Sequence, residues 1–301
     1  MDCAKAVGAR IARPEKQLGQ MSGILKVGKP IPTLISIPTT AGTGSEATLA
    51  AVITDSTTRH KYAINDFPLI PKAAVLDPAF TRTLPKSLTA TTGMDALTHA
   101  VEAYIGRSTT RQTRAWAVEA VKLVFASIEK AYADGNDMQA RADMARAAYF
   151  AGAAFSQSYV GYIHAVAHSL GGQYNVPHGL ANAVLLPVIL DAYGECVQKK
   201  LHELAIAAGL STRSDSDAAG SEKFICAIRR LNRDMGIPQT IDGIREEDIP
   251  KLARYAAKEA NPLYPVPVLW DADQLERFYY AVSSAKMRPE RQRTSVPAPV
   301  M

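Results

Sequence analysis

Residues 161–179 read GYIHAVAHSLGGQYNVPHG and carry His164, His168 and His178 within fifteen positions, although the whole chain has only six histidines. His164 and His168 are four residues apart, so they share one face if this stretch forms a helix. His178 follows ten residues later, between a proline and a glycine. The stretch therefore predicts a helix that presents imidazole nitrogens to a common ligand, with a third imidazole close by.

A second stretch with the same spacing lies upstream. Residues 93–102 read GMDALTHAVE, in which Asp95 and His99 are four apart and can offer a carboxylate oxygen and an imidazole nitrogen to one ion. Imidazoles with one carboxylate suit Fe²⁺ or Zn²⁺ better than Ca²⁺ or Mg²⁺, which prefer oxygen ligands. A single histidine of this kind is more often a hydrogen-bonded core residue, but the two spaced pairs together predict a metal site.

The first 84 residues have the pattern of an α/β unit. Apolar runs at 33–37 and 73–78 predict buried strands, and 47–54 with 60–64 predict a hairpin across a polar turn. The loop PTTAGTGSE at 38–46 follows the first strand directly. Its glycines let the backbone approach a ligand closely, and its hydroxyl groups can donate hydrogen bonds. By itself such a loop is a weak signal for binding.

From Pro85 onward the spacing of apolar residues is helical, and helices are predicted over 114–132, 138–159 and 197–209. We therefore predict an α/β unit followed by an all-α unit. The predicted division of the chain is 1–84, 85–287 and a disordered tail at 288–301.

Composition agrees with an enzyme of a reducing compartment, and we expect a cytoplasmic protein. With 47% hydrophobic residues in 301 positions the chain can bury a substantial core. The net charge of +5 comes from scattered Lys and Arg, so neither nucleic acid nor a membrane is predicted as a partner. Three distant cysteines argue against disulfides, and no apolar run is long enough to cross a bilayer. The basic start of the chain superficially resembles a transit peptide, but the acidic Asp2 and Glu15 argue against one.

Taken together, the three motifs closely resemble the iron-containing (group III) alcohol dehydrogenases. The loop at 38–46, the segment at 93–102 and the histidine stretch ending at Gly179 keep the family's order, and the resemblance runs from residue 1 to about residue 285. It implies a Rossmann-like dinucleotide-binding part and a helical metal-binding part, the fold of the dehydroquinate synthase-like superfamily. It also implies a homo-oligomer that transfers hydride between a small aliphatic alcohol or aldehyde and the nicotinamide of NAD or NADP.

Carried over residue by residue, the resemblance implies roles for individual side chains. His168 would lie beside substrate and cofactor and relay a proton. The metal, Fe²⁺ or alternatively Zn²⁺, would be held by Asp95, His99, His164 and His178. The residues beside the dinucleotide would be Thr39, Thr40, Gly42, Thr43, Thr48 and Lys61. A solvated surface side chain is an equal alternative for the lysine.

The resemblance also predicts that a segment is missing. Family members have a Gly-Gly-Gly-Ser turn before an Asp-x-x-Lys helix, whereas residues 1–8, MDCAKAVG, begin inside that helix, so about 100 residues, one small domain, are expected to be missing in front. Such a turn holds the pyrophosphate, and a nearby acidic residue selects NAD over NADP. We therefore expect residues 1–301 to bind NAD(P)H weakly or not at all. The alternative function is an inactive remnant, a metal-binding helical domain without dinucleotide binding.

A few further residues receive predictions. Glu102, one turn after His99, is either an acceptor for a ligand imidazole or a solvent-facing acid. His60 and His202 match no motif and are predicted to lie at the surface. Candidates for the substrate pocket are Phe155, Tyr159, Tyr162 and Asn175.

Overall fold

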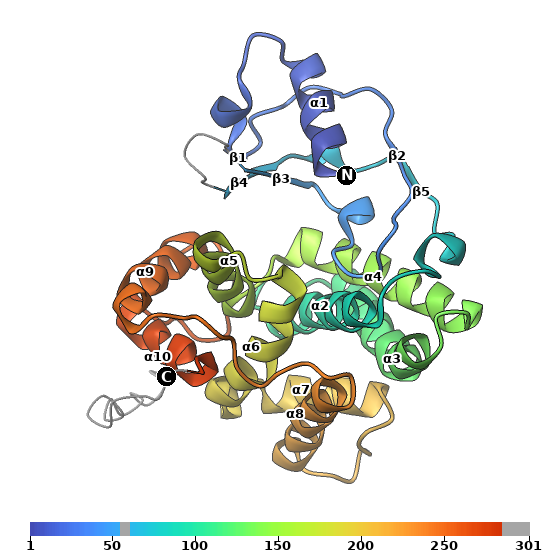
Figure 1. Cartoon of the computed structure of the whole chain (residues 1–301), viewed down its shortest axis with the longest axis vertical. Helices are drawn as coiled ribbons and strands as arrows, with labels where there is room; N and C mark the ends of the chain where they lie inside the picture. Colours follow the sequence, from blue (N-terminus) through green and yellow to red (C-terminus); the bar gives the residue numbers. More distant parts are fainter. Residues whose placement is uncertain (55–60, 285–301) are drawn as a thin grey trace.

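The computed structural model describes residues 1–54 and 61–284, which form two parts stacked on each other (Figure 1). A small α/β part comes first, and in the described residues after it only an isolated bridge between Ile241 and Ser283 departs from helices and loops. The predicted fold class is confirmed. The predicted turn at 55–59, His60 and the tail at 288–301 lie outside the described residues. None of the helices in the described ranges combines the length and apolar character needed to cross a bilayer.

The core of the first part is a helix packed on a short sheet. α1 (Asp2–Ala12) contacts β3 (Ala50–Thr54), which pairs antiparallel with β4 (Lys61–Asn65), so the predicted hairpin is confirmed. β1 (Gly23–Ile24) pairs in parallel with the other side of β4. Between these elements lies a small apolar cluster, formed by Ala9, Met21, Val27, Ala51, Ile64 and Leu69.

A separate parallel pair consists of β2 (Ile35–Ser36) and β5 (Ala73–Ala74). The prediction that both strands are buried is wrong for their large apolar side chains. The isoleucines on either side of Ser36 are 59% and 48% exposed, and Val75 is 46% exposed, whereas Ser36 is 2% exposed. Successive side chains of a strand point to opposite faces, and here the serine takes the inner face.

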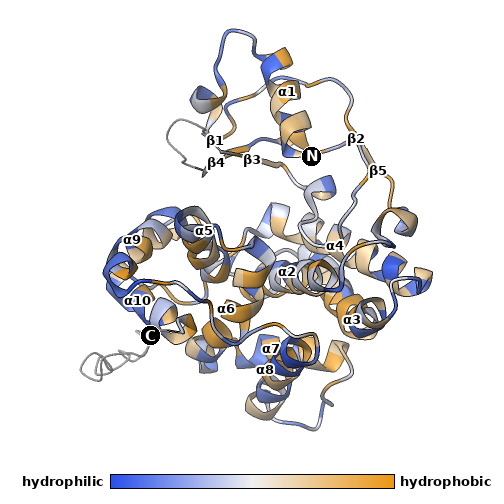
Figure 2. Cartoon of the chain, in the orientation of Figure 1, coloured by the Kyte–Doolittle hydropathy of each residue, from blue (hydrophilic) through white to orange (hydrophobic). Residues whose placement is uncertain are grey.

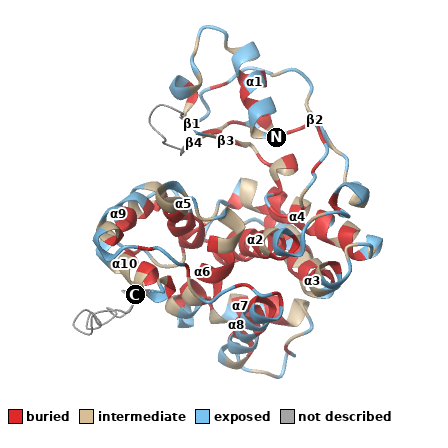
Figure 3. Cartoon of the chain, viewed as in Figure 1, coloured by how far each residue is buried: buried red, intermediate tan, exposed pale blue. Residues whose placement is uncertain are grey.

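The second part is a set of helices packed around α2 (Lys86–Ile105). Every α2 residue from 93 to 105 is buried. Figure 2 shows mainly apolar residues along α6, and Figure 3 shows buried residues concentrated in α2, α5 and α6, with exposed residues on the outer helices. The other helices are α3 (Arg111–Ala133), α4 (Met138–Ser158), α5 (Tyr162–Tyr174), α6 (His178–Tyr193), α7 (Glu195–Ala207), α8 (Asp217–Asp234), α9 (Ile249–Ala260) and α10 (Ala272–Val282).

Three of these helices, α3, α4 and α7, confirm the helices predicted from apolar spacing. Short 3-10 turns link the longer elements. They are η1 (Leu18–Met21), η2 (Ser45–Ala47), η3 (Phe67–Leu69), η4 (Pro78–Thr81) and η5 (Glu246–Asp248).

The prediction that His202 lies at the surface is wrong. His202 on α7 is 6% exposed, because α8 packs over it. Its Nδ1 lies 2.9 Å from Asp217 Oδ1 and its Nε2 lies 3.0 Å from the Thr212 carbonyl oxygen. Both ring nitrogens therefore have a hydrogen-bond acceptor, which accounts for a histidine in a helix interface.

Candidate metal centre

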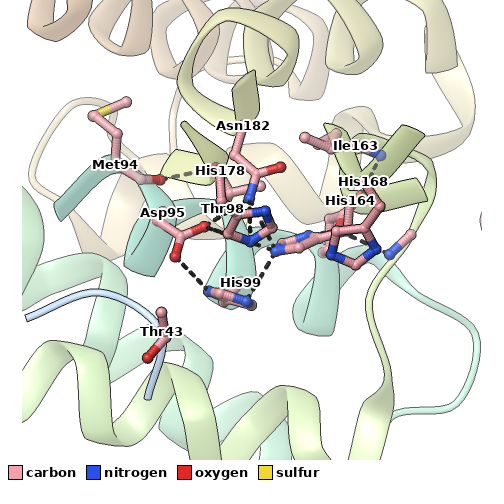
Figure 4. Close-up of polar contacts among 12 residues, drawn as sticks. Thr43, Met94, Asp95, Thr98, His99, Ile163, His164, His168, His178 and Asn182 are labelled. Atoms are coloured by element: carbon pink, nitrogen blue, oxygen red, sulfur yellow. Dashed lines mark hydrogen bonds and ion pairs between the residues drawn. The ribbon is translucent and has the colours of Figure 1, made fainter. Parts of the chain in front are cut away.

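Three helices bring the four predicted ligands together. Asp95 and His99 lie on α2, His164 lies on α5, and His178 is the first residue of α6. One potential ligand atom from each of the four lies within 4.8 Å of the others (Figure 4). The exposed fraction is only 2% for Asp95, 4% for His99 and 2% for His164. The cluster is therefore held by helix packing inside the protein, with His178 at its more open side.

Glu102 fixes the orientation of His164. Its carboxylate accepts hydrogen bonds from His164 Nδ1 at 2.6 Å and from the backbone N–H groups of Gly161 and Ile163, each at 2.8 Å. A Cβ atom at Gly161 would lie 2.7 Å from Glu102 Oε1, so this close approach requires glycine. Glu102 is 4% exposed, and the alternative of a solvent-facing acid is wrong. Because Nδ1–H of His164 donates to Glu102, its Nε2 carries the lone pair.

The lone pairs of the cluster fit a cation. His164 Nε2 lies 2.9 Å from His99 Nε2. If His99 carries its proton on Nδ1, the lone pairs of the two Nε2 atoms face each other. If His99 carries its proton on Nε2, the lone pair of its Nδ1 faces Asp95 Oδ2 at 3.8 Å. His99 Nδ1 is also buried and has no hydrogen-bond partner among the described residues. Both tautomers leave lone pairs opposed, and a bound divalent cation would relieve that opposition.

The protonation of the imidazoles also favours metal binding. Burial lowers the pKa of His99, and burial together with the neighbouring His99, His178 and His168 rings holds the pKa of His164 well below its usual range. Burial raises the pKa of Glu102 to about 7, against the effect of its N–H donors. Neutral imidazole is the form that binds a metal.

His168 lies beside the four residues rather than among them. It is one turn beyond His164 on α5, and its ring stacks on that of His178 with centroids 5.1 Å apart. Its side chain is 40% exposed, and its Nδ1 lies 2.6 Å from Glu259 Oε1. The same carboxylate oxygen accepts from the hydroxyl of Tyr264 at 2.8 Å. His168 thus lies between the buried cluster and solvent.

One residue of the cluster was missed by the sequence analysis. Asn182 on α6 is fully buried, and its Nδ2 donates to Asp95 Oδ1 at 2.6 Å. The same nitrogen lies 3.1 Å from His164 Nε2 and 3.2 Å from His178 Nε2. The signal that could have found it is the four-residue spacing from His178, which places both on one helix face.

The loop that resembles a dinucleotide site rests on the helical part. Gly44 has a left-handed backbone (φ 60°), and a Cβ atom there would lie 2.5 Å from Gly152 Cα on α4. The contact is reciprocal, since a Cβ at Gly152 would lie 2.5 Å from the Gly44 carbonyl oxygen. Leu49 N–H donates to Ser156 Oγ, one turn further along α4. Two backbones therefore meet without side chains between them.

A buried lysine holds the same loop from the other side. Lys5 on α1 is fully buried, and its Nζ donates to the carbonyl oxygens of Ser45, Thr48 and Ala50 at 2.7–2.9 Å and to Thr48 Oγ1 at 3.0 Å. Burial lowers the pKa of Lys5 to about 8. The Thr48 hydroxyl is thus engaged inside the protein.

The remaining loop residues predicted beside the dinucleotide take different positions. Thr39 and Thr43 are exposed, Thr40 is half-buried, and Gly42 is buried. A Cβ atom at Gly42 would lie 2.7 Å from Thr92 Cβ on α2, the helix of Asp95 and His99. Lys61 begins β4, and its side chain lies outside the described residues.

The substrate-pocket candidates separate into two groups. Phe155 on α4 stacks on His99 with centroids 4.2 Å apart, so it forms a wall of the cluster. Tyr162 does not line a pocket, because it is fully buried and its hydroxyl bonds to Asn261 and to the Trp270 carbonyl oxygen. Tyr159 and Asn175 are exposed residues with positive φ at the ends of α4 and α5.

Comparisons with known proteins give the same family for both parts of the chain. The family pattern described as iron-containing alcohol dehydrogenase matches residues 1–78, and that of the Fe-containing alcohol dehydrogenase family, C-terminal, matches residues 89–282. A 1,3-propanediol dehydrogenase of Klebsiella pneumoniae is 41% identical over 86% of this chain and 67% of its own length. An NAD-dependent methanol dehydrogenase of Bacillus methanolicus is 38% identical over 86% of this chain and 68% of its own.

A solved structure extends the likeness to three dimensions. The crystal structure of a 1,3-propanediol oxidoreductase superposes with a TM-score of 0.88 at 38% identity, covering 93% of this chain and 73% of the other. The chain thus spans about two thirds to three quarters of the length of these proteins. On the matching sequence patterns, identities and fold, the chain belongs to the iron-containing alcohol dehydrogenases, a family of oxidoreductase enzymes.

Proposed function

We propose that this protein is a metal-dependent NAD(P) alcohol dehydrogenase that interconverts a small aliphatic alcohol and its aldehyde. The observation that carries the proposal is the buried cluster of one carboxylate and three imidazoles, with a ligand atom of each within 4.8 Å of the others. The proposed ligands are Asp95, His99, His164 and His178. Fe²⁺ is the proposed metal and Zn²⁺ the alternative, because both accept this donor set.

Asp95 supplies the one carboxylate of the ligand set, and burial lowers the pKa of His99 and of His164, which favours their neutral forms. When bound, the divalent metal acts as a Lewis acid that polarises the substrate oxygen and lowers the pKa of the alcohol. The Phe155 ring, stacked on His99, restricts the space beside the cluster. The matched relatives named for 1,3-propanediol and methanol support a small substrate.

The loop at residues 39–48 is the proposed seat of the dinucleotide, which would supply the hydride acceptor for oxidation of the alcohol. The proposed contacts are Thr39, Thr40, Gly42, Thr43, Thr48 and Lys61. Exposure of Thr39 and Thr43 supports direct contact, whereas Thr48 would act by holding the loop, because its hydroxyl bonds to Lys5. The contact between Gly44 and Gly152 holds this loop against the helix that carries Phe155.

His168 is the proposed proton relay. Oxidation of an alcohol to an aldehyde releases a hydride from carbon and a proton from oxygen, and the proton must reach solvent. His168 stacks on His178 and is 40% exposed, so it lies on a route from the cluster to water. Glu259 accepts from its Nδ1, which supports Nε2 as the nitrogen that would take the proton.

A second function, a metal-binding helical domain without dinucleotide chemistry, is favoured by one observation. The first part buries a cluster of small size and leaves Val7, Ile11 and Val52 at 52%, 59% and 46% exposure around an apolar hollow. An apolar face of the first part is thus open to solvent. In this reading the cluster would bind metal but the loop would not hold a nicotinamide.

The two functions are separated by titrating the metal-loaded protein with NADH and NADPH while following cofactor fluorescence, and then assaying a series of primary alcohols and diols. Saturable binding with alcohol-dependent reduction of the cofactor is expected for the dehydrogenase, in contrast to the weak or absent NAD(P)H binding that the family resemblance predicts for residues 1–301. Metal bound at about one ion per chain without cofactor binding would contradict it and favour the second function.

A further inference from the structure

Asn182 is placed where three helices meet. It lies one turn after His178 on α6, and none of its surface is exposed. Its side-chain nitrogen reaches Asp95 on α2, His164 on α5 and His178 on its own helix, at 2.6, 3.1 and 3.2 Å. Figure 4 shows the amide directed into the group formed by these side chains.

The direction of the amide follows from the chemistry of its partners. An ionised carboxylate only accepts hydrogen bonds, so the short contact to Asp95 Oδ1 requires the NH₂ group of Asn182. One N–H then remains for the two nearby imidazoles, and it can bond only to an Nε2 that presents a lone pair, on His164 or on His178. Those lone pairs are the ones that a metal ion needs.

This orientation of the amide has a cost in stability, because it leaves the amide oxygen without a partner in the described part of the chain. Asn182 Oδ1 is buried and has no hydrogen-bond partner among the described residues. An unpaired buried acceptor destabilises a fold, so packing alone would favour an apolar side chain at this position on α6. The stabilising contribution of the amide therefore comes from the contacts of Nδ2 with the ligand side chains.

We propose that Asn182 is a positioning residue of the metal centre, which holds the Asp95 carboxylate and one imidazole Nε2, that of His164 or of His178, in place before an ion binds. The proposal rests on the proposed metal site. Asn182 acts through the ligands, and its effect is on the affinity for metal and on the coordination geometry. Partners of ligating side chains affect metal affinity in this way by about 10–100-fold.

The chain offers a matched control in Asn232 on α8. Asn232 is also buried, at 8% exposure, its Nδ2 donates to the Ala183 carbonyl oxygen at 2.6 Å, and its Oδ1 has no partner among the described residues. It contacts α6 one residue away from Asn182, and its hydrogen bond goes to the backbone and not to any of the four ligands. Replacing each by leucine removes a buried amide from the same region of the fold.

The test uses the full chain and cobalt(II), whose visible absorption reports coordination geometry. Wild type, Asn182→Leu and Asn232→Leu are titrated with cobalt against a competing chelator, and far-UV circular dichroism verifies folding. Asn182→Leu should weaken cobalt binding by about 10–100-fold and change the absorption bands. Asn232→Leu should keep both the affinity and the spectrum of the wild type. Asn182→Ala, which adds no bulk, serves if the leucine variant does not fold.

Each outcome decides one question. Wild-type affinity and spectrum in the folded Asn182 variants would overturn the positioning role while leaving the metal site intact. An equal loss in the Asn232 variant would also overturn it, because the effect would then come from packing. Failure of the wild type itself to bind cobalt would overturn the proposed metal site, and the positioning role with it.

Discussion

The metal cluster and the loop at residues 39–48 differ in how they are held. The cluster belongs to three helices, and all of its predicted ligands except His178 are buried. The loop lies in a part with short strands, and it is held by Lys5, by the contact between Gly44 and Gly152 and by the close approach of Gly42 to Thr92. Helix packing defines the position of a side chain through many contacts, whereas the position of the loop depends on a few. Changes near the loop should therefore alter turnover without removing metal.

The largest expected effect is at His168, which lies between the metal cluster and solvent. His168→Ala should lower turnover by about 10²–10⁴-fold, because proton transfer loses its side chain, and should retain the metal. Turnover against pH and metal content are the measurements. Loss of metal together with turnover would make His168 a ligand instead.

The second largest effect is expected from a substitution at the contact between Gly44 and Gly152. Gly152→Ala places a methyl group 2.5 Å from the Gly44 carbonyl oxygen, so the loop must shift. Misplacing a reacting group by about 1 Å can cost about 100-fold, and we expect a fall in kcat of about 10–100-fold with unchanged metal content. Gly172→Ala on α5 is the matched control, because a Cβ there meets nothing within 4 Å. Equal kinetics in the two variants would show that the glycine contact does not position the loop for turnover.

A smaller effect is expected when the helical region is changed behind the ligands. Glu102→Gln replaces the carboxylate that accepts from His164 and from two N–H groups at the start of α5. Metal affinity should fall by about 10–100-fold, while the NADH affinity of the loop should stay near that of the wild type. Competition with a chelator and cofactor fluorescence measure the two. A change confined to NADH binding would contradict the separation of the regions.

The smallest effect concerns His202, which is buried like His164 but has acceptors on both ring nitrogens. The hydrogen bond to Asp217, followed by that to the Thr212 carbonyl, raises the pKa of His202 above its ordinary value of 6.5. A raised folded-state pKa gives stabilisation that is complete below about 6.5 and is lost as pH rises through the folded-state value. The unfolding temperature of the wild type should thus fall relative to His202→Gln as pH rises above about 6.5. Parallel curves for the two proteins would show that the contact does not titrate in this way.

The sequence was sufficient to predict contacts between residues that lie close together along the chain. The spacings of Asp95 to His99 and of His164 to His168 each place two side chains on one helix face, and this depends only on helix geometry. The helices α3, α4 and α7 followed from apolar spacing for the same reason. The grouping of the four cluster residues was predicted from two such pairs and from the resemblance to a family.

The contacts that the sequence did not predict join residues that lie far apart along the chain. Asn182 contacts Asp95 across 87 positions, and Glu259 contacts His168 across 91. The exposed isoleucines beside Ser36 depend on which elements cover a strand, and an apolar run does not contain that information. His202 was missed in the same way, because its burial comes from the packing of α8.

The most direct test of the central claim is the metal content of the purified protein and of two ligand variants, measured by elemental analysis. Removing one of four ligands leaves an open and unbalanced site. We predict about one Fe²⁺ or Zn²⁺ per chain in the wild type, and near-complete loss in His164→Ala and in His178→Ala, with helical content retained. Unchanged metal content in both variants would contradict the assignment of Asp95, His99, His164 and His178 as the metal site.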